Sequence, residues 1–164
     1  LMSGESEGDW YYQQINLGLN YRITDIQAAL GASQYSRLDD FVTSRNRIAN
    51  RYNEQLVDFP VSTQQICPNA YSAYHLFVIK LLKENHIKKR KHIFSSMREA
   101  GIGVNVHYIP VHTHPYYKRL GFSYGDFPEA EKYYQSALSI PMFPDLTNED
   151  QDYVISSLHK ALDF

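Results

Sequence analysis

The 164-residue sequence predicts a small α+β domain, in which a few strands are covered by about four helices. Three observations predict this class. A stripe of apolar residues at helical spacing runs over residues 24–56, two segments at 74–82 and 102–107 are patterned as strands, and capping patterns open further helices. The 43% hydrophobic content is enough for a buried core in a chain of this length.

The first helix is expected to begin at Thr24, because Gln27 three residues later completes a capping-box pattern. Apolar residues then recur every three or four positions as far as residue 56, and Pro60 ends the segment. Two aspartates at 39–40 are expected to mark a kink or a restart within this helical run.

Strands are expected in three places. Residues 74–82 carry apolar side chains on most of both faces, and residues 102–107 alternate so that His107 lies on the polar side where the strand ends. Spacing alone favours a parallel crossover between these two strands. A short strand at 138–142 is confined to an edge or an end of the sheet by Pro141.

Asn85 is expected to cap a helix that runs to about Ala100 and stops at Gly101. The exposed face of this helix carries four cations at 88–91. A nucleic-acid surface is one interpretation, but four cations on one helix face are usually only solvated, and no interleaved aromatic residues support base stacking.

Two more helices open on capping patterns. Asp126 with Glu129 marks one, with a proline in its first turn, and Thr147 with Asp150 marks the last. The first of these is expected to bury Ala130, Tyr133 or Tyr134, and Ala137.

The bulk composition excludes several classes of function. A net charge of −2 argues against broad attraction to nucleic acid or to an anionic membrane, and no apolar run approaches the ~20 residues of a membrane span. No signal peptide is recognised at the start. Cys67 is the single cysteine, which excludes an internal disulfide and fits a reducing cytoplasm, and no base stands near it to make it a nucleophile.

Asn20 and Arg22 lie just before the first helix. A side-chain amide, a guanidinium and the unpaired N–H groups of a helix N-terminus form a donor set suited to a phosphate group. The alternative is that Arg22 is a surface residue and that Asn20 only shapes the turn.

The stretch GLNYRITDIQAALG at 18–31 resembles the signature of the sugar aminotransferases of the DegT/DnrJ/EryC1/StrS family. The resemblance continues through Trp10–Gln14, Val106–His112, Gly125–Glu131 and Ser139–Pro144, and so covers nearly the whole chain. This family consists of pyridoxal-phosphate enzymes of the aspartate-aminotransferase fold type (fold type I) that aminate keto-sugars attached to nucleotides. The branch it resembles most acts on a UDP-linked 4-keto-6-deoxy-hexosamine in pseudaminic acid synthesis.

The resemblance implies that residues 1–23 are a lead-in and cofactor-phosphate loop, and that residues 24–164 are the C-terminal domain, with a mostly antiparallel sheet. The Schiff-base lysine and the carboxylate that pairs with the pyridine nitrogen are expected upstream of this chain, in a separate cofactor-binding domain. The chain alone is therefore expected to be inactive. The intact enzyme is expected to be a cytoplasmic homodimer that takes its amino group from glutamate.

The same resemblance implies roles for individual residues. Asn20 would reach across the homodimer interface to the cofactor phosphate in the partner's site, and Arg22 would help there or hold the loop. His107, Tyr108 and His112 would contact the sugar or the nucleotide.

Alternatives remain for these histidines. Together with His114, they place three imidazoles within eight residues, but no cysteine or carboxylate stands near them in sequence to complete a zinc site. They would also serve to hold a loop by hydrogen bonds to the backbone. A second hypothesis for the whole chain is a non-catalytic module that binds a sugar nucleotide or a protein partner.

Overall fold

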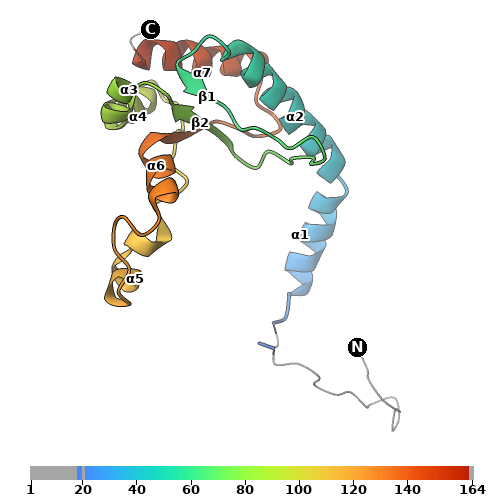
Figure 1. Ribbon diagram of the computed structural model, residues 1–164. Coiled ribbons are helices and arrows are strands. Elements are labelled where there is room, and N and C mark those ends of the chain that lie inside the picture. Colours follow the sequence, from blue (N-terminus) through green and yellow to red (C-terminus); the bar gives the residue numbers. More distant parts are fainter. Residues whose placement is uncertain (1–17, 20, 163–164) are drawn as a thin grey trace, which may run out of the picture. The chain divides into compact units, whose positions relative to one another are not determined.

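The structure is a computed structural model that describes residues 18–19 and 21–162 (Figure 1). Its contacts divide the chain into two compact units, Leu1–Arg37 and Leu38–Phe164. The described residues form seven α-helices, one 3-10 helix and three short strands. None of the helices within this described part is long and apolar enough to cross a membrane.

In the first unit, helix α1 (Asp25–Tyr35) begins at the predicted capping box. The Thr24 hydroxyl accepts the Gln27 N–H at 3.3 Å, and the Gln27 side chain accepts the Thr24 N–H at 3.0 Å. All residues of α1 are exposed. The chain turns at residues 36–37, slightly before the expected break, and α2 (Leu38–Gln55) opens the second unit.

The second unit contains a three-stranded sheet in the order β1 (Val61–Ser62), β2 (Phe77–Leu81), β3 (Ala137–Ile140). Both pairings are antiparallel. The antiparallel sheet implied by the family resemblance is thus confirmed. The segments at 74–82 and 102–107 both run antiparallel to β3, so they point in the same direction, as spacing suggested, but β3 lies between them and they do not pair with each other. Within the three-stranded sheet β3 lies at an edge, and it ends just before Pro141, as predicted.

The expected strand at 102–107 is reduced to one bridge, in which Asn105 pairs with Ser139. Ile102 and Val104 are buried, as their alternation predicted. The Val104 N–H donates to the Ile102 carbonyl at 2.9 Å, so this backbone donor bonds locally instead of joining the sheet.

The helix expected at 85–100 is two helices, α3 (Glu84–Lys88) and α4 (Arg90–Glu99). Asn85 lies inside α3, whose N-cap makes no side-chain hydrogen bond, so the predicted cap is wrong. Gly101 ends α4 as predicted. It has a positive φ of 77°, and the Ile102 N–H closes back onto the Met97 carbonyl at 3.0 Å, which is the Schellman arrangement.

The cations at 88–91 do not form a uniform surface for nucleic acid. Lys88 pairs with Glu84 at 2.7 Å. The guanidinium of Arg90 lies 4.7 Å from the centre of the Tyr134 ring and donates to the Tyr134 carbonyl. Lys88 and Arg90 are therefore engaged within the chain, and Lys89 also has a partner.

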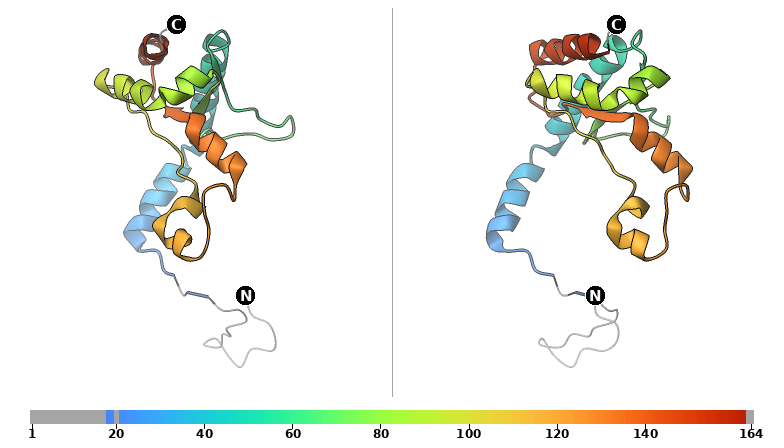
Figure 2. Two further views of the ribbon diagram at one scale, coloured as in Figure 1. Left: turned by 60° about the vertical axis from the view of Figure 1, so that its left-hand side comes forward. Right: turned by 90° about the vertical axis from the view of Figure 1, so that its left-hand side faces the viewer.

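The core lies between the sheet and helices α2, α4 and α7 (Asn148–Ala161), and α4 packs against α7 (Figure 2). The Thr147 cap of α7 is confirmed by its hydrogen bond from the Asp150 N–H. The largest fully buried side chains are Tyr52, Phe77, Ile48, Leu56, Ile79, Leu81, Ile93, Met97, Leu138, Leu158, Leu162 and Gln151.

Polar contacts pin α2 to the ends of the strands. Arg45 on α2 donates to the carbonyls of Tyr74 at 2.9 Å and Met142 at 3.0 Å. The Tyr52 hydroxyl donates to the Pro141 carbonyl at 3.1 Å. One helix thus holds both the approach to β2 and the exit from β3.

We predict that Leu138→Ala lowers the free energy of unfolding by about 2–5 kcal/mol, because it opens a cavity beneath β3. Leu138 is 1% exposed, whereas Leu82, which is 60% exposed, provides the control substitution Leu82→Ala. Urea unfolding followed by circular dichroism gives both values. Equal stabilities for the two variants would contradict the assignment of Leu138 to the core.

Candidate functional site

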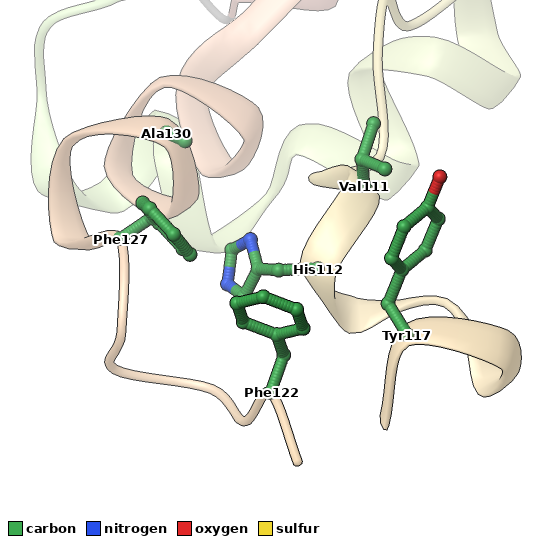
Figure 3. A pocket seen from close by; sticks show the side chains of 6 residues that line it. All are labelled: Val111, His112, Tyr117, Phe122, Phe127 and Ala130. Atoms are coloured by element: carbon green, nitrogen blue, oxygen red, sulfur yellow. The ribbon is translucent and has the colours of Figure 1, made fainter. Parts of the chain in front are cut away.

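Residues 107–127, which we name the 107–127 lobe, project from the sheet ahead of α6 (Pro128–Ser136) (Figures 1 and 2). The lobe contains the short helices η1 (Val111–Thr113) and α5 (Pro115–Arg119). The Thr113 hydroxyl donates to the Pro110 carbonyl at 2.7 Å and so tightens the turn of η1. This turn directs His112 inward, toward α6 (Figure 3).

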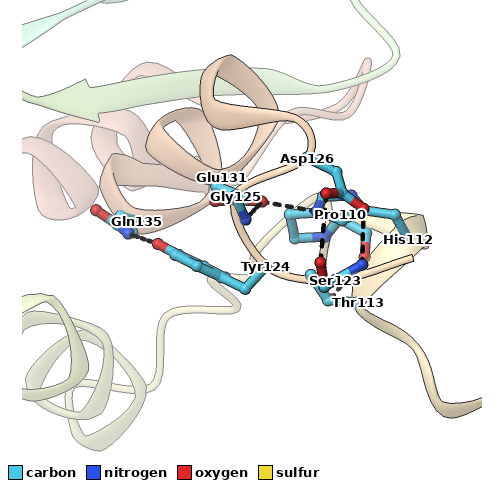
Figure 4. Close-up of polar contacts among 9 residues, drawn as sticks. All are labelled: Pro110, His112, Thr113, Ser123, Tyr124, Gly125, Asp126, Glu131 and Gln135. Carbon is cyan, nitrogen blue, oxygen red and sulfur yellow. Dashed lines mark hydrogen bonds and ion pairs between the residues drawn. The ribbon is translucent and has the colours of Figure 1, made fainter. Parts of the chain in front are cut away.

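His112 is joined to Glu131 of α6. The His112 Nε2 atom lies 2.7 Å from Glu131 Oε1, and the two side chains are 7% and 5% exposed. The Gly125 N–H donates to the same oxygen, also at 2.7 Å (Figure 4). One buried carboxylate therefore connects η1, the end of the lobe and α6.

The pKa of Glu131 lies below its ordinary value of 4.5. Burial by itself would raise this pKa, but the hydrogen bonds from Gly125 and His112, together with the contact to the Phe127 backbone, outweigh it. The group is thus a carboxylate at neutral pH, and it acts as an acceptor for both donors.

An apolar cavity of about 420 Å³ adjoins this pair (Figure 3). The His112 and Phe127 rings lie 4.8 Å apart, and the Phe122 ring is 6.2 Å from that of Phe127. The cavity is lined by Val111, His112, Tyr117, Phe122, Phe127 and Ala130. Such a lining suits an apolar or flat part of a ligand, and His112 and Tyr117 are its members with polar atoms.

His107 and Tyr108 stand at the start of the lobe. His107 is half-buried, and its Nδ1 atom lies 2.8 Å from the Ser139 hydroxyl of β3. Tyr108 is 59% exposed and stacks on His114, with the ring centres 5.6 Å apart. The three predicted substrate residues are therefore on one lobe, but each histidine has its own partner.

The histidines do not converge on one point. His107 contacts Ser139, His112 contacts Glu131, and His114 contacts Tyr108. Across residues 18–19 and 21–162, no group of three or more His, Cys, Asp or Glu side chains is arranged to hold a metal ion.

The predicted phosphate loop is described only in part. Asn20 lies outside the described residues, and Arg22 is exposed ahead of α1. The capping box uses the N–H groups of Thr24 and Gln27, which leaves the two N–H groups between them, those of Asp25 and Ile26, for another acceptor. Backbone N–H groups and a guanidinium are the kinds of donor that bind phosphate, and the phosphate site at this turn stays a prediction.

Sequence reasoning missed Glu131 and misplaced the start of α6. Phe127, not Asp126, is the N-cap, because the Asp126 carboxylate instead accepts the Ser123 N–H at 2.7 Å. Ala130 is exposed and Glu131 is buried, contrary to the predicted face, whereas Ala137 is buried as predicted. The available signal in the sequence was the position of Glu131, an acidic residue between Ala130 and Tyr133, which were both expected to face inward.

Comparison with known proteins identifies the family. The model of the DegT/DnrJ/EryC1/StrS aminotransferase family matches residues 2–159. The chain belongs to this family. Its fold agrees, since Spr1654 of Streptococcus pneumoniae, solved in apo, PMP and PLP forms, superposes in the apo form with a TM-score of 0.84 and 26% identity over 97% of this chain and 40% of that one.

Two curated relatives are similar over most of this chain. SpsC of Bacillus subtilis, a spore coat polysaccharide biosynthesis protein, is 37% identical over 93% of this chain and 40% of its own length. The UDP-4-amino-4,6-dideoxy-N-acetyl-beta-L-altrosamine transaminase of Campylobacter jejuni is 34% identical over 94% of this chain and 41% of its own length. The chain thus spans about two fifths of the relatives that it matches.

We predict that Glu131→Gln flattens the acid dependence of stability. Because the folded-state pKa of Glu131 is lowered, its contribution is full above the unfolded value of about 4.5 and is lost as pH falls through the folded pKa. The wild-type urea midpoint should therefore fall toward that of the variant in acid.

The matched control is Glu129→Gln, on the exposed side of the same first turn. Its midpoint should follow that of the wild type at every pH. If the midpoints of Glu131→Gln and Glu129→Gln have the same pH dependence, the buried carboxylate does not stabilise the lobe.

Proposed function

We propose that this chain is the C-terminal domain of a pyridoxal-phosphate-dependent aminotransferase that converts a UDP-linked 4-keto-6-deoxy sugar to the 4-amino sugar. The family match over residues 2–159 carries the proposal. The similarity to a transaminase named for a UDP-linked 4-amino-4,6-dideoxy sugar supports the substrate class. The assignment to pseudaminic acid synthesis rests on that similarity and on the sequence motifs.

The proposed enzyme is a cytoplasmic homodimer that uses glutamate as amino donor. A preceding domain would supply the lysine that holds the cofactor, and residues 24–164 would form the C-terminal domain behind the loop at 1–23. By itself the chain would then be inactive. The share of about two fifths that it covers in its relatives agrees with this division.

Pyridoxal phosphate supplies an electron sink when it is bound. In the proposal, Asn20 and Arg22 hold its phosphate in the partner subunit's site. The donors that fit a phosphate group at the start of α1 support this role. The exposed position of Arg22 leaves its guanidinium accessible.

The 107–127 lobe would form one wall of the sugar-nucleotide pocket. Tyr108 is exposed and able to contact a ligand, while Ser139 fixes the orientation of His107. His112, which lines the apolar cavity, would contact the part of the substrate that enters it. These residues orient the substrate and exclude water, and the preceding domain would carry out the proton transfer.

Asn20→Ala in the full-length protein tests the cofactor role. We expect cofactor affinity to fall about 10- to 100-fold, because a hydrogen bond to a charged phosphate contributes about 1.5–3 kcal/mol. Absorbance titration with pyridoxal phosphate measures it, and Asn50→Ala on the exposed side of α2 is the control. If Asn20→Ala keeps the wild-type affinity for pyridoxal phosphate and the wild-type turnover, Asn20 does not hold the cofactor.

Calorimetry with UDP-sugars separates the enzyme from a non-catalytic binding module. The isolated chain should bind UDP-sugars weakly or not at all if a second domain supplies most of the pocket. The full-length protein should bind them and transfer the amino group of glutamate to a UDP-4-keto sugar. Tight binding by the isolated chain, without transfer by the full-length protein, would favour the module.

A further inference from the structure

We propose that Glu131 is a positioning residue, whose carboxylate takes the Nε2–H of His112 and leaves Nδ1 as the ring nitrogen that can meet a substrate. This inference rests on the proposed function, because it treats His112 as a substrate contact. It adds a residue outside the predicted site and specifies which chemical group His112 can recognise.

The geometry determines which ring nitrogen of His112 carries the proton. Glu131 Oε1 lies 2.7 Å from His112 Nε2, and an ionised carboxylate can only accept. The proton between them must therefore sit on Nε2. The Gly125 N–H holds the same oxygen at 2.7 Å, so the carboxylate is itself anchored from a second direction.

The surroundings prevent the imidazole from turning to another partner. Both side chains of the pair are buried, and the Phe127 ring lies 4.8 Å from that of His112. Glu131 is also held within α6, the helix that leads directly into β3. A buried hydrogen bond to a carboxylate that is itself anchored on α6 gives the histidine one orientation, whereas a solvent-exposed partner would leave the imidazole free to rotate.

The assignment changes the expected chemistry of His112. In the neutral imidazole with Nε2 protonated, Nδ1 is an acceptor. It would then recognise a hydroxyl or an amide N–H of the sugar, and not a phosphate oxygen. The apolar lining of the adjacent cavity agrees with a sugar substituent rather than a phosphate.

Long-range ¹H–¹⁵N NMR of the labelled chain at mildly alkaline pH reports which nitrogen of His112 carries the proton. We expect the Nε2–H tautomer in the wild type and in Glu131→Gln, whose amide oxygen accepts the same bond. Glu131→Ala should give a mixture of the two tautomers, and Glu129→Ala should match the wild type. An Nδ1–H signal in the wild type would overturn the proposal even if Glu131→Ala fails to fold.

Kinetics of the full-length enzyme supply the functional readout. We expect Glu131→Ala to lose about tenfold in kcat/KM for the UDP-sugar, the loss of one hydrogen bond, and Glu131→Gln to recover most of it. Unchanged kcat/KM in Glu131→Ala would refute the positioning role. If the wild type has no transferase activity while the tautomer is fixed as expected, the proposed function fails and the Glu131–His112 coupling stands.

Discussion

Four residue pairs join β2 to β3, from Phe77 opposite Ile140 to Lys80 opposite Ala137. Because α6 runs without a break into β3, this pairing also fixes where the last turns of α6 lie. The bridge from Asn105 to Ser139 then sets the point at which the chain leaves the sheet for the lobe. The candidate site therefore depends on an antiparallel pairing that contributes few of its residues.

The 107–127 lobe is a long connecting segment that buries few of its own side chains, and most of its large apolar side chains are exposed. Such a loop keeps one conformation only if contacts within it offset the entropy of ordering it. At its base, His107 is tied to Ser139. Farther out, the Glu131 carboxylate ties His112 and the Gly125 backbone to α6. These two contacts hold the aromatic residues around the cavity.

The sequence predicted features that depend on neighbours in the chain. The caps at Thr24 and Thr147 were found because a capping hydrogen bond spans three residues. The strand order, in which β3 lies between β2 and the segment at 102–107, was not predicted, because strand partners are chosen by contacts between distant segments. Glu131 was missed because a carboxylate in a first helical turn usually signals a solvated terminus, and its partner lies 19 residues away.

Holding a loop with a buried carboxylate also costs free energy, because the charged group loses its hydration. An apolar residue of similar volume often packs as well, since it avoids the desolvation of a buried charge. Packing alone thus does not explain Glu131, whose neighbours include Phe127 and the apolar cavity. A carboxylate provides what an apolar side chain lacks, which is a fixed acceptor for one chosen imidazole proton. The cost of burying it is understandable if the orientation of His112, and not only the stability of the lobe, is what the site requires.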